Sequence, residues 1–312
     1  MIVTMGKVLV IGLVGQSVFM STDHFPRPGE TITSRQLFFE PGGKGMNQAV
    51  ACHKFGADTV FISAIGRDAN GQACKEEVAR FGIKAHWIEK EEPTAFGVIT
   101  TDHKGENTVN VYGGAAHALK AVDLSGPQIR SYVRECDYLL LQNEFPEEVL
   151  LALSKMAEEF DKPVVWNPAP AKKISREILP MASVITPNYG EAKLIAGFAE
   201  EKNPSDEEFA TVFQKMGIKA AVITMGREGS LLIDAKGHRR IPACAVGEAI
   251  DTTGAGDCFN GTLTACLAEG KSLDEACQWA AVAAGISVTR RGATACIPDY
   301  EETKAVYYMK RA

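Results

Sequence analysis

Short apolar runs alternate with segments of helical spacing along most of the chain. Residues 7–14 and 59–64 are nearly continuous apolar runs, and residues 46–55 between them repeat apolar side chains at helical spacing up to Gly56. The same alternation predicts strands at 138–142, 164–167 and 184–186 and helices at 71–81, 147–160 and 190–196. Strands that are apolar on both faces and separated by amphipathic helices predict an α/β protein with a doubly wound, mainly parallel sheet.

The last third of the chain continues this alternation. Two segments fit the capping box, in which side chains satisfy the free backbone amides of a first helical turn. They are Ser205 with Glu208 and Ser272 with Glu275. Strands are predicted at 220–225 and 230–234, and further helices after Gly256 and from Tyr300.

Two stretches break the rhythm. Residues 19–39 and 94–112 alternate β-branched or aromatic residues with polar ones, and no helix intervenes. They predict antiparallel strands that form a small β lid, from about residues 14–40 and 94–114, on one α/β domain spanning residues 1–312. Because unpaired sheet edges expose free backbone hydrogen-bonding groups, we expect a homodimer through the lids.

Composition and charge exclude several classes of protein. The 33 Lys and Arg against 39 Asp and Glu give a net charge of −6, and no basic block is present. A general nucleic-acid binder or a binder of anionic membranes is therefore not expected. The N-terminal apolar run predicts a buried strand rather than a signal peptide, and no run approaches the ~20 apolar residues of a membrane span. These features predict a cytoplasmic protein.

The metal-binding and disulfide-forming residues show no pattern of their own. The eight cysteines are scattered without a C-x-x-C pair, which favours free, mostly buried thiols. The six histidines are also dispersed and match no zinc-ligand spacing, so a protein-ligated zinc site is not expected.

The sharpest chemical signal is a glycine-rich turn before a helix, Asp251-Thr252-Thr253-Gly254-Ala255-Gly256-Asp257. Glycines at 254 and 256 let the backbone approach a ligand, and the free amides and positive dipole end of the helix attract a phosphate. Asp257 at its edge could accept a proton from a hydroxyl that attacks a phosphoryl group. On the motif alone, Asp257 could equally complement the helix dipole.

A second glycine-rich turn, Gly42-Gly43-Lys44-Gly45-Met46-Asn47, also leads into a helix. It does not fit the Walker pattern, and no strand is followed by the G-x-G-x-x-G of a dinucleotide site, which argues against a nucleotide-dependent dehydrogenase. Taken alone it predicts a structural turn, or else Asn47 and the exposed amides bind sugar hydroxyls.

Together, and in this order, the two turns resemble the signatures of the ribokinase family of carbohydrate kinases. Further segments follow in the family's order: Phe25 to Thr31, Gln142-x-Glu144, Asn167 to Ala171, Thr186 to Ala192, Thr224-x-Gly226-x-x-Gly229 and Val288 to Ala293. The resemblance covers essentially the whole chain and implies a ribokinase-like fold. A non-catalytic sugar- or nucleotide-binding regulatory relative would be expected to have lost the turn at 254–256 or Asp257.

The resemblance implies ATP-dependent phosphorylation of the terminal hydroxymethyl group of a sugar, with ribose the leading candidate. Asp257 would be the base, and the amides of Gly254, Ala255 and Gly256 would hold the phosphoryl charge. The implied sugar contacts are Gly42, Gly43, Asn47, Glu144, Asp257, Ser17 and Phe96. The implied nucleotide contacts are Asn188, Thr224, Gly226, Gly229, Gly256 and Asn260. Mg²⁺ would bind near Glu191 through water, and K⁺ near Asp251, Thr253, Ser287 and Gly292.

Three positions depart from the family pattern. Gly15 and Ser17 stand where ribokinases carry an Asn and an Asp that grip ribose hydroxyls. A larger pocket at Gly15, with Phe96 stacking on the acceptor, keeps 2-deoxyribose, a hexose derivative or a nucleoside open as acceptors. Cys296 replaces a serine of the cation loop, and a neutral thiol is a poor ligand for a hard cation.

Overall fold

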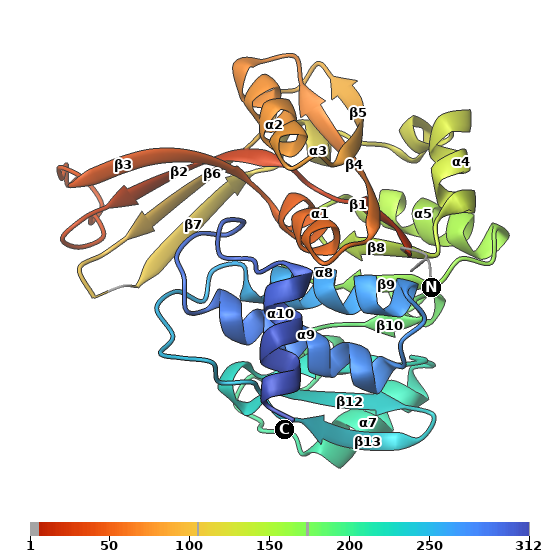
Figure 1. Cartoon of the computed structure of the whole chain (residues 1–312). Coiled ribbons are helices and arrows are strands. Elements are labelled where there is room, and N and C mark those ends of the chain that lie inside the picture. The colour runs from red at the N-terminus through yellow and green to blue at the C-terminus, as the bar shows by residue number, and fades with distance from the viewer. Residues whose placement is uncertain (1–5, 105, 173–174, 312) are drawn as a thin grey trace.

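The computed structural model describes residues 6–104, 106–172 and 175–311. In this part of the chain, nine strands form one large sheet in the order β13-β12-β11-β10-β9-β8-β1-β4-β5 (Figure 1). They are β1 (Lys7–Ile11), β4 (Asp58–Gly66), β5 (Lys84–Lys90), β8 (Tyr138–Gln142), β9 (Val164–Asn167), β10 (Val184–Ile185), β11 (Ala221–Thr224), β12 (Ser230–Asp234) and β13 (Gly237–Ile241). All neighbours pair in parallel except β11 with β12 and β12 with β13.

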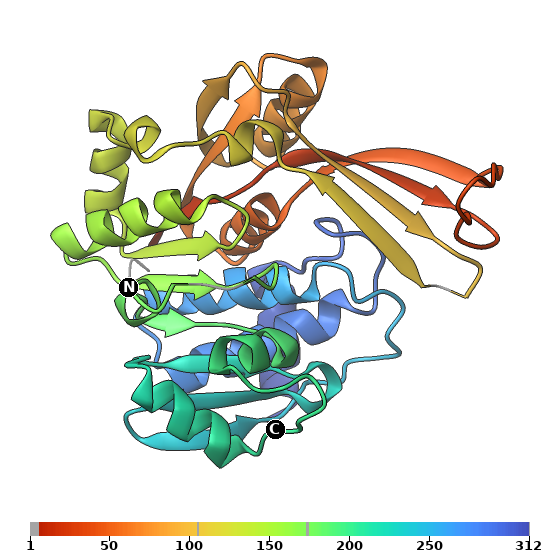
Figure 2. The ribbon, with the colours of Figure 1, turned by 180° about the vertical axis from the view of Figure 1, so that it is seen from behind.

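Helices cover both faces of this sheet, as Figures 1 and 2 show from opposite sides. They are α1 (Lys44–Lys54), α2 (Ala69–Arg80), α3 (Gly114–His117), α4 (Pro127–Glu135), α5 (Glu147–Glu159), α6 (Tyr189–Ala196), α7 (Asp206–Lys215), α8 (Ala255–Ala268), α9 (Leu273–Ser287) and α10 (Tyr300–Met309). Short 3-10 turns lie at Ala121–Leu124, Leu179–Met181 and Gly226–Glu228. The predicted doubly wound, mainly parallel sheet is confirmed.

Strand β1 shows why the sequence gives two cores. Val8 and Val10 lie in a cluster with α1, α8 and α9, whereas Leu9 and Ile11 lie in a cluster with α4, α5 and α7. Because successive side chains of a strand point to opposite faces, an uninterrupted apolar strand buries both faces of the sheet.

The lid is a second sheet of four strands in the described part of the chain, in the order β3-β2-β6-β7. It is built from β2 (Gly15–Ser21), β3 (Gln36–Gly42), β6 (Ala95–Thr101) and β7 (Asn107–Tyr112), and it projects to one side of the core (Figure 1). The two outer pairs are antiparallel, as expected, but the central pair β2 and β6 is parallel. Both central strands run outward from the core, with Gly15 beside Ala95, which explains the difference.

Other predicted boundaries need correction. Strand β1 ends at Ile11 rather than residue 14. Glycine is required at the next position, because a Cβ on Gly12 would overlap Gln142 and the backbone of Gly45. Strands β5 and β13 and helix α4 were not expected from the sequence. The capping box at Ser205 forms in full. At Ser272 only half forms, since its hydroxyl accepts the Glu275 amide but no reciprocal bond is found among the described residues.

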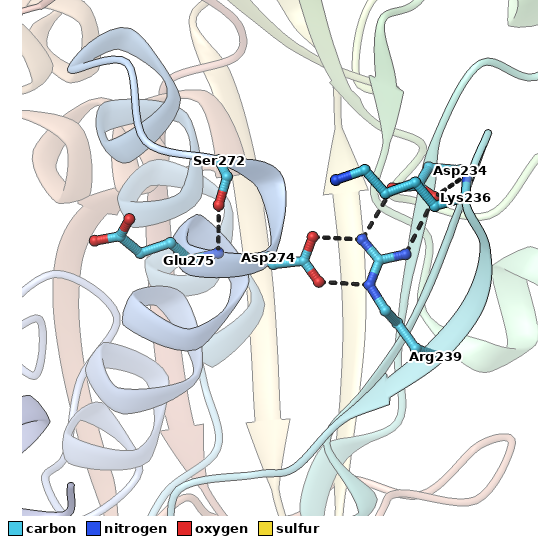
Figure 3. Close-up of polar contacts among 6 residues, drawn as sticks. All are labelled: Asp234, Lys236, Arg239, Ser272, Asp274 and Glu275. Carbon is cyan, nitrogen blue, oxygen red and sulfur yellow. Dashed lines mark hydrogen bonds and ion pairs between the residues drawn. The ribbon is translucent and has the colours of Figure 1, made fainter.

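An ion-pair cluster joins the antiparallel edge to the helix layer (Figure 3). Arg239 of β13 donates to both carboxylate oxygens of Asp234, at 3.1 and 2.9 Å, and also pairs with Asp274 in the first turn of α9. A guanidinium can serve two carboxylates in its plane because it carries five N–H donors. The cluster fixes the β12–β13 hairpin against α9, the helix that leads to the loop beside the glycine-rich turn at 251–257.

Two expectations about residue classes can be compared with the structure. All eight cysteines are free thiols, and seven of them are buried. Over residues 6–104, 106–172 and 175–311, no helix has both the length and the apolar character needed to cross a bilayer.

Candidate active site

Polar side chains collect where the central parallel strands end. Gln142 and Asn167 are the last residues of β8 and β9, and Thr186 directly follows β10, and all three are buried. Ligand sites in open parallel sheets lie at the carboxyl ends of the strands. Buried polar side chains at this edge therefore mark the place to look for the site.

Helices α1 and α8 meet directly above this edge. A Cβ on Gly261 would lie 2.4 Å from the Ala51 Cβ and 2.6 Å from the Gln48 carbonyl oxygen, so only glycine allows this approach. One turn earlier on each helix, the side chains of Asn47, Gln48 and Asp257 come into contact. The glycine after Asn260 is thus what brings the two glycine-rich motifs together.

Asp257 is buried and accepts one hydrogen bond on each carboxylate oxygen. Asn47 Nδ2 donates to Oδ2 and Gln48 Nε2 donates to Oδ1, each at 2.9 Å. The Oδ1 atom of Asn47 is buried and has no partner among the described residues. A buried polar atom without a partner is costly, so this oxygen suits a donor supplied by a ligand such as a sugar hydroxyl.

A chain of hydrogen bonds holds this arrangement from behind. Gln48 Nε2 also donates to Asn167 Oδ1 at 3.0 Å, and Gln142 donates to Gln48 Oε1 at 2.8 Å. Asn167 donates to the Thr186 carbonyl at 2.9 Å. The chain closes through Asn260, which accepts the Thr186 hydroxyl and donates to the Gly256 carbonyl in the first turn of α8. The Oε1 atom of Gln142 is left without a partner among the described residues, but the bonds between the other members fix the orientation of Gln48 behind Asp257.

A partly buried lysine, Lys44, carries a positive charge that acts on three carboxylates. The charge of Asp257, followed by those of Glu144 and Glu191, raises the pKa of Lys44. Burial raises the pKa of Glu144 to about 7, Lys44 opposes that rise, and Asp257 adds to it. The Glu144 carboxylate also accepts the Gly45 amide at 3.3 Å. The site therefore holds one cation for three acidic groups, and Glu144 changes charge near neutral pH.

The turn at 251–257 has the conformation that its glycines suggested. Gly254 has a φ of 73° and precedes α8, and a Cβ there would lie 2.8 Å from the Ala293 carbonyl oxygen. The amides of the first turn of a helix have no partner within the helix. The Ala255 amide donates to the Thr252 carbonyl at 3.2 Å, whereas no backbone acceptor for the Gly256 amide is found among the described residues, so the Gly256 amide is available to an anion next to Asp257.

The loop predicted to bind a monovalent cation lies against this turn. Asp251 accepts the amides of Thr253 and Gly292, at 2.9 and 3.2 Å. The Ser287 carbonyl accepts the Arg290 amide, and the Cys296 sulfur lies 3.9 Å from the Thr253 carbonyl oxygen. The carboxylate and carbonyl oxygens fit a hard cation. Burial raises the pKa of Cys296 to about 11, so its thiol is neutral and adds no good ligand.

The residues predicted to bind nucleotide lie along neighbouring strand ends. Asn188 and Glu191 cap α6 reciprocally, each side chain accepting the other's amide at 2.8 Å. Asn188 also pairs with Thr224 in a parallel bridge, and Gly226 and Gly229 follow. Glu191 is buried rather than solvated, and burial raises its pKa.

The lid separates two residues that were both predicted to bind sugar. Ser17 pairs with Gly97 across the β2–β6 pair, whereas Phe96 pairs with Gln16. Because side chains alternate along a strand, Phe96 lies on the opposite face of the lid from Ser17. We therefore correct the prediction for Phe96.

Gly15 does not leave an open pocket either. A Cβ there would lie 2.5 Å from the Ala95 carbonyl oxygen, so the neighbouring strand fills that space. The expectation of a larger pocket at this position was wrong.

Three site residues were not identified from the sequence. They are Lys44, which was noted only as part of the glycine-rich turn at 42–47, and Gln48 and Gly97, which were not singled out. For Gln48 and Gly97 the signal is a pairing across the fold: Gln48 bonds Asp257, 209 residues away, and Gly97 pairs with Ser17.

Comparison with known proteins decides the family. The profile described as pfkB family carbohydrate kinase matches residues 5–300. The chain belongs to the pfkB family of carbohydrate kinases. It is 37% identical to the ribokinase of Haemophilus influenzae over 296 residues, which covers 94% of this chain and 96% of that protein. It is 33% identical to the ribokinase of Staphylococcus aureus, covering 96% and 99%.

Solved structures agree with this assignment. The ribokinase of Thermotoga maritima superposes with a TM-score of 0.88 at 34% identity, covering 97% of this chain and 99% of that one. The Arabidopsis thaliana ribokinase complexed with ribose and ATP gives a TM-score of 0.88 at 26% identity, covering 97% and 98%. The predicted ribokinase-like fold is thereby confirmed.

Proposed function

We propose that this ATP-dependent carbohydrate kinase of the pfkB family transfers the γ-phosphoryl group of ATP to the terminal hydroxymethyl group of ribose. The observation that carries the proposal is the buried Asp257 carboxylate, fixed by Asn47 and Gln48 in the first turn of α8. The similarity to ribokinases over nearly the whole chain supports ribose as the acceptor. A kinase of the same family acting on 2-deoxyribose, a hexose derivative or a nucleoside is the alternative, because Ser17 offers only one hydroxyl.

In this mechanism Asp257 accepts the proton of the attacking hydroxyl as the O–P bond forms. The amides of Gly254, Ala255 and Gly256 hold the phosphoryl oxygens, because a helix N-terminus attracts negative charge. Asn47 and Glu144 accept hydroxyls of the sugar and orient it. Bound Mg²⁺ would neutralise charge on the ATP phosphates, and Glu191, a buried carboxylate near Lys44, would hold it through water.

The nucleotide lies on the other side of the α8 turn in this proposal. Asn188, Thr224 and Gly226 line the phosphate end. A cavity of about 430 Å³ between α9, α10 and residues 241–245 has the size for the adenine base. Gly229 lies next to Ala243, one of its lining residues, since a Cβ on Gly229 would lie 2.7 Å from the Ala243 amide nitrogen.

A monovalent cation completes the proposed site. Asp251 and the carbonyl oxygens of Thr253, Ser287 and Gly292 form an oxygen-rich loop against Gly254. A cation there would lower the negative potential beside the phosphoryl group and stabilise the glycine turn. Because Cys296 adds no ligand, we expect K⁺ to bind with one oxygen fewer than a serine would give.

One assay tests these assignments together. Purified enzyme with Mg²⁺-ATP is offered ribose, 2-deoxyribose, fructose, a ketogluconate-type sugar and a nucleoside, and ADP release is measured in K⁺, Na⁺ or tetramethylammonium salts. We expect the highest kcat/KM with ribose and a higher rate in K⁺. Best turnover with a nucleoside or hexose would refute ribose but leave the kinase. Equal rates in all three salts would refute the cation site.

The lid supports a proposal of a homodimer. Its outer strands expose large apolar side chains in two groups, Leu37, Phe38 and Phe39 on β3 and Val109, Val111 and Tyr112 on β7. Apolar edge strands are suited to packing against a second copy.

We therefore expect a dimer in sedimentation velocity at micromolar concentration. Val109→Lys with Val111→Lys is expected to give a folded monomer. Val122→Lys, at an equally exposed apolar side chain outside the lid, is the matched control. A monomeric wild-type protein would contradict the lid interface.

A further inference from the structure

The face of the lid that carries Ser17 has a composition of its own. Cross-strand partners share a face, and Ser17 pairs with Glu40 on β3 and with Gly97 on β6. We call this face the inner face of the lid. Its members along the four strands are Gln36, Phe38, Glu40, Gly42, Gly15, Ser17, Phe19, Ser21, Ala95, Gly97, Ile99, Thr101, Asn107, Val109 and Val111.

The inner face is continuous with the proposed sugar site. Gly42 ends β3 on this face, and the next residue, Gly43, is the N-cap of α1, which carries Asn47. The Ser17 hydroxyl lies 4.0 Å from the position of a Cβ on Gly42. A sugar held by Asn47 and Asp257 therefore has Ser17 and its cross-strand neighbours on its lid side.

Glu40 is the one carboxylate on this face within the described residues. It stands directly opposite Ser17, where Cβ atoms of cross-strand pairs are about 4.5–5.5 Å apart. Its side chain is two carbons longer than the serine side chain and reaches beyond it. Across Ser17 on the other side, Gly97 has no side chain, so nothing there competes for the space.

The Glu40 carboxylate is half-buried and its charge is not satisfied by the protein. No hydrogen bond or ion pair to it is found in the part of the chain that the structure describes. The nearest basic group, Arg80, donates instead to both oxygens of Glu77, at 2.9 and 2.5 Å. Burial raises the pKa of Glu40, with Glu77 and Asp251 adding to the rise and Arg80 opposing it. A desolvated carboxylate without donors is stabilised by a ligand that brings them.

We propose that Glu40 is a sugar-binding residue whose carboxylate accepts hydroxyl groups of the acceptor from the lid, in place of a carboxylate at position 17. This deepens the proposed function and rests on it. A carboxylate accepts two neighbouring hydroxyls at once, which one serine hydroxyl does not. In the next cross-strand pair outward, the rings of Phe19 and Phe38 stack with their centroids 4.7 Å apart. They close the outer end of the proposed sugar site with apolar surface. Such a site favours a sugar with adjacent hydroxyls over its deoxy analogue.

The test compares kcat/KM for ribose and 2-deoxyribose, at saturating ATP, in the wild type and four variants. Glu40→Gln keeps the shape of the side chain and removes its charge. It is expected to lower kcat/KM for ribose about ten- to a hundredfold, and to change that for 2-deoxyribose and the KM for ATP by less than about threefold. Glu92→Gln, an exposed glutamate before β6, removes the same charge off the inner face and is expected to match the wild type.

The other two variants, Glu40→Ala alone and a double variant, test the effect of moving the carboxylate. In the double variant Glu40→Ala with Ser17→Asp, the acid returns to the same face from the neighbouring strand, and ribose turnover is expected to recover at least about tenfold over Glu40→Ala alone. A merely structural role for Glu40 predicts no such recovery. Ribose turnover unchanged in Glu40→Gln, or equal losses for ribose and 2-deoxyribose, would overturn the inference alone. A wild type that phosphorylates neither sugar would overturn the proposed function as well.

Discussion

Replacing Asp257 with Asn is expected to lower kcat by about 10²–10⁴ while leaving the protein folded and able to bind ATP. The loss is the usual contribution of a general base, and the amide keeps the shape of the carboxylate. The measurements are steady-state turnover with ribose, ATP affinity by calorimetry and thermal unfolding. The effect is large because both carboxylate oxygens are already oriented by Asn47 and Gln48, so the proton acceptor is held in place before substrate arrives.

Gln48→Leu gives the companion result. It removes one bond to Asp257 and the link to Asn167 but keeps the base. We therefore expect a smaller loss of turnover than in Asp257→Asn, together with lower thermal stability, since it leaves buried polar groups without partners. Near-normal turnover in Asp257→Asn would return Asp257 to the role of a charge at a helix end.

The large sheet could be predicted because its signal is local. An apolar strand followed by a helix of matching spacing defines β1, α1 and β4 without knowledge of the rest of the chain. Strand β13 was not predicted because its sequence, Gly237 to Ile241, is mostly polar. It is held by pairing with β12 and by the contact of Arg239 with Asp274, 35 residues further on. No local pattern encodes such a pair.

The site was predicted only as far as its motifs reach. A glycine-rich turn before an apolar helical segment indicates where a helix begins, so Gly254 and Asp257 could be identified as site residues for a physical reason. The faces of the lid could not, because they depend on the register between β2 and β6, which lie about 80 residues apart. A one-residue shift in register exchanges the two faces of a strand. The sequence prediction therefore placed Phe96 beside Ser17, whereas the residues that share the face of Ser17 are Gly97 and Glu40.

Removing the positive charge of Lys44 should have the second large effect on ribose turnover. In Lys44→Met, the carboxylates of Asp257, Glu144 and Glu191 lose the positive charge that offsets them. Loss of this charge destabilises the three carboxylates, and proton uptake recovers part of the cost. We expect kcat/KM for ribose at pH 7 to fall about a hundredfold, and the loss to be smaller at pH 8.5. Lys44→Arg, which keeps the charge, is the control.

The pH dependence of sugar binding follows from the same cluster. Glu144 binds hydroxyls as a carboxylate, and with a pKa of about 7 in the wild type it is half protonated at neutral pH, so ribose affinity should rise through pH 7. Lys44 lowers this pKa, so Lys44→Met should move the rise in ribose affinity to higher pH, and Glu144→Gln should abolish it.

The free energy of unfolding depends on pH in the opposite direction. A carboxyl pKa raised from 4.5 stabilises the fold below pH 4.5, and this contribution, about 3 kcal/mol, is lost as pH rises through 7. Calorimetric titrations from pH 5.5 to 8.5 measure the ribose affinity, and thermal unfolding over the same range measures the stability. If Lys44→Met did not shift the pH dependence of ribose affinity, Lys44 would not control the charge of Glu144.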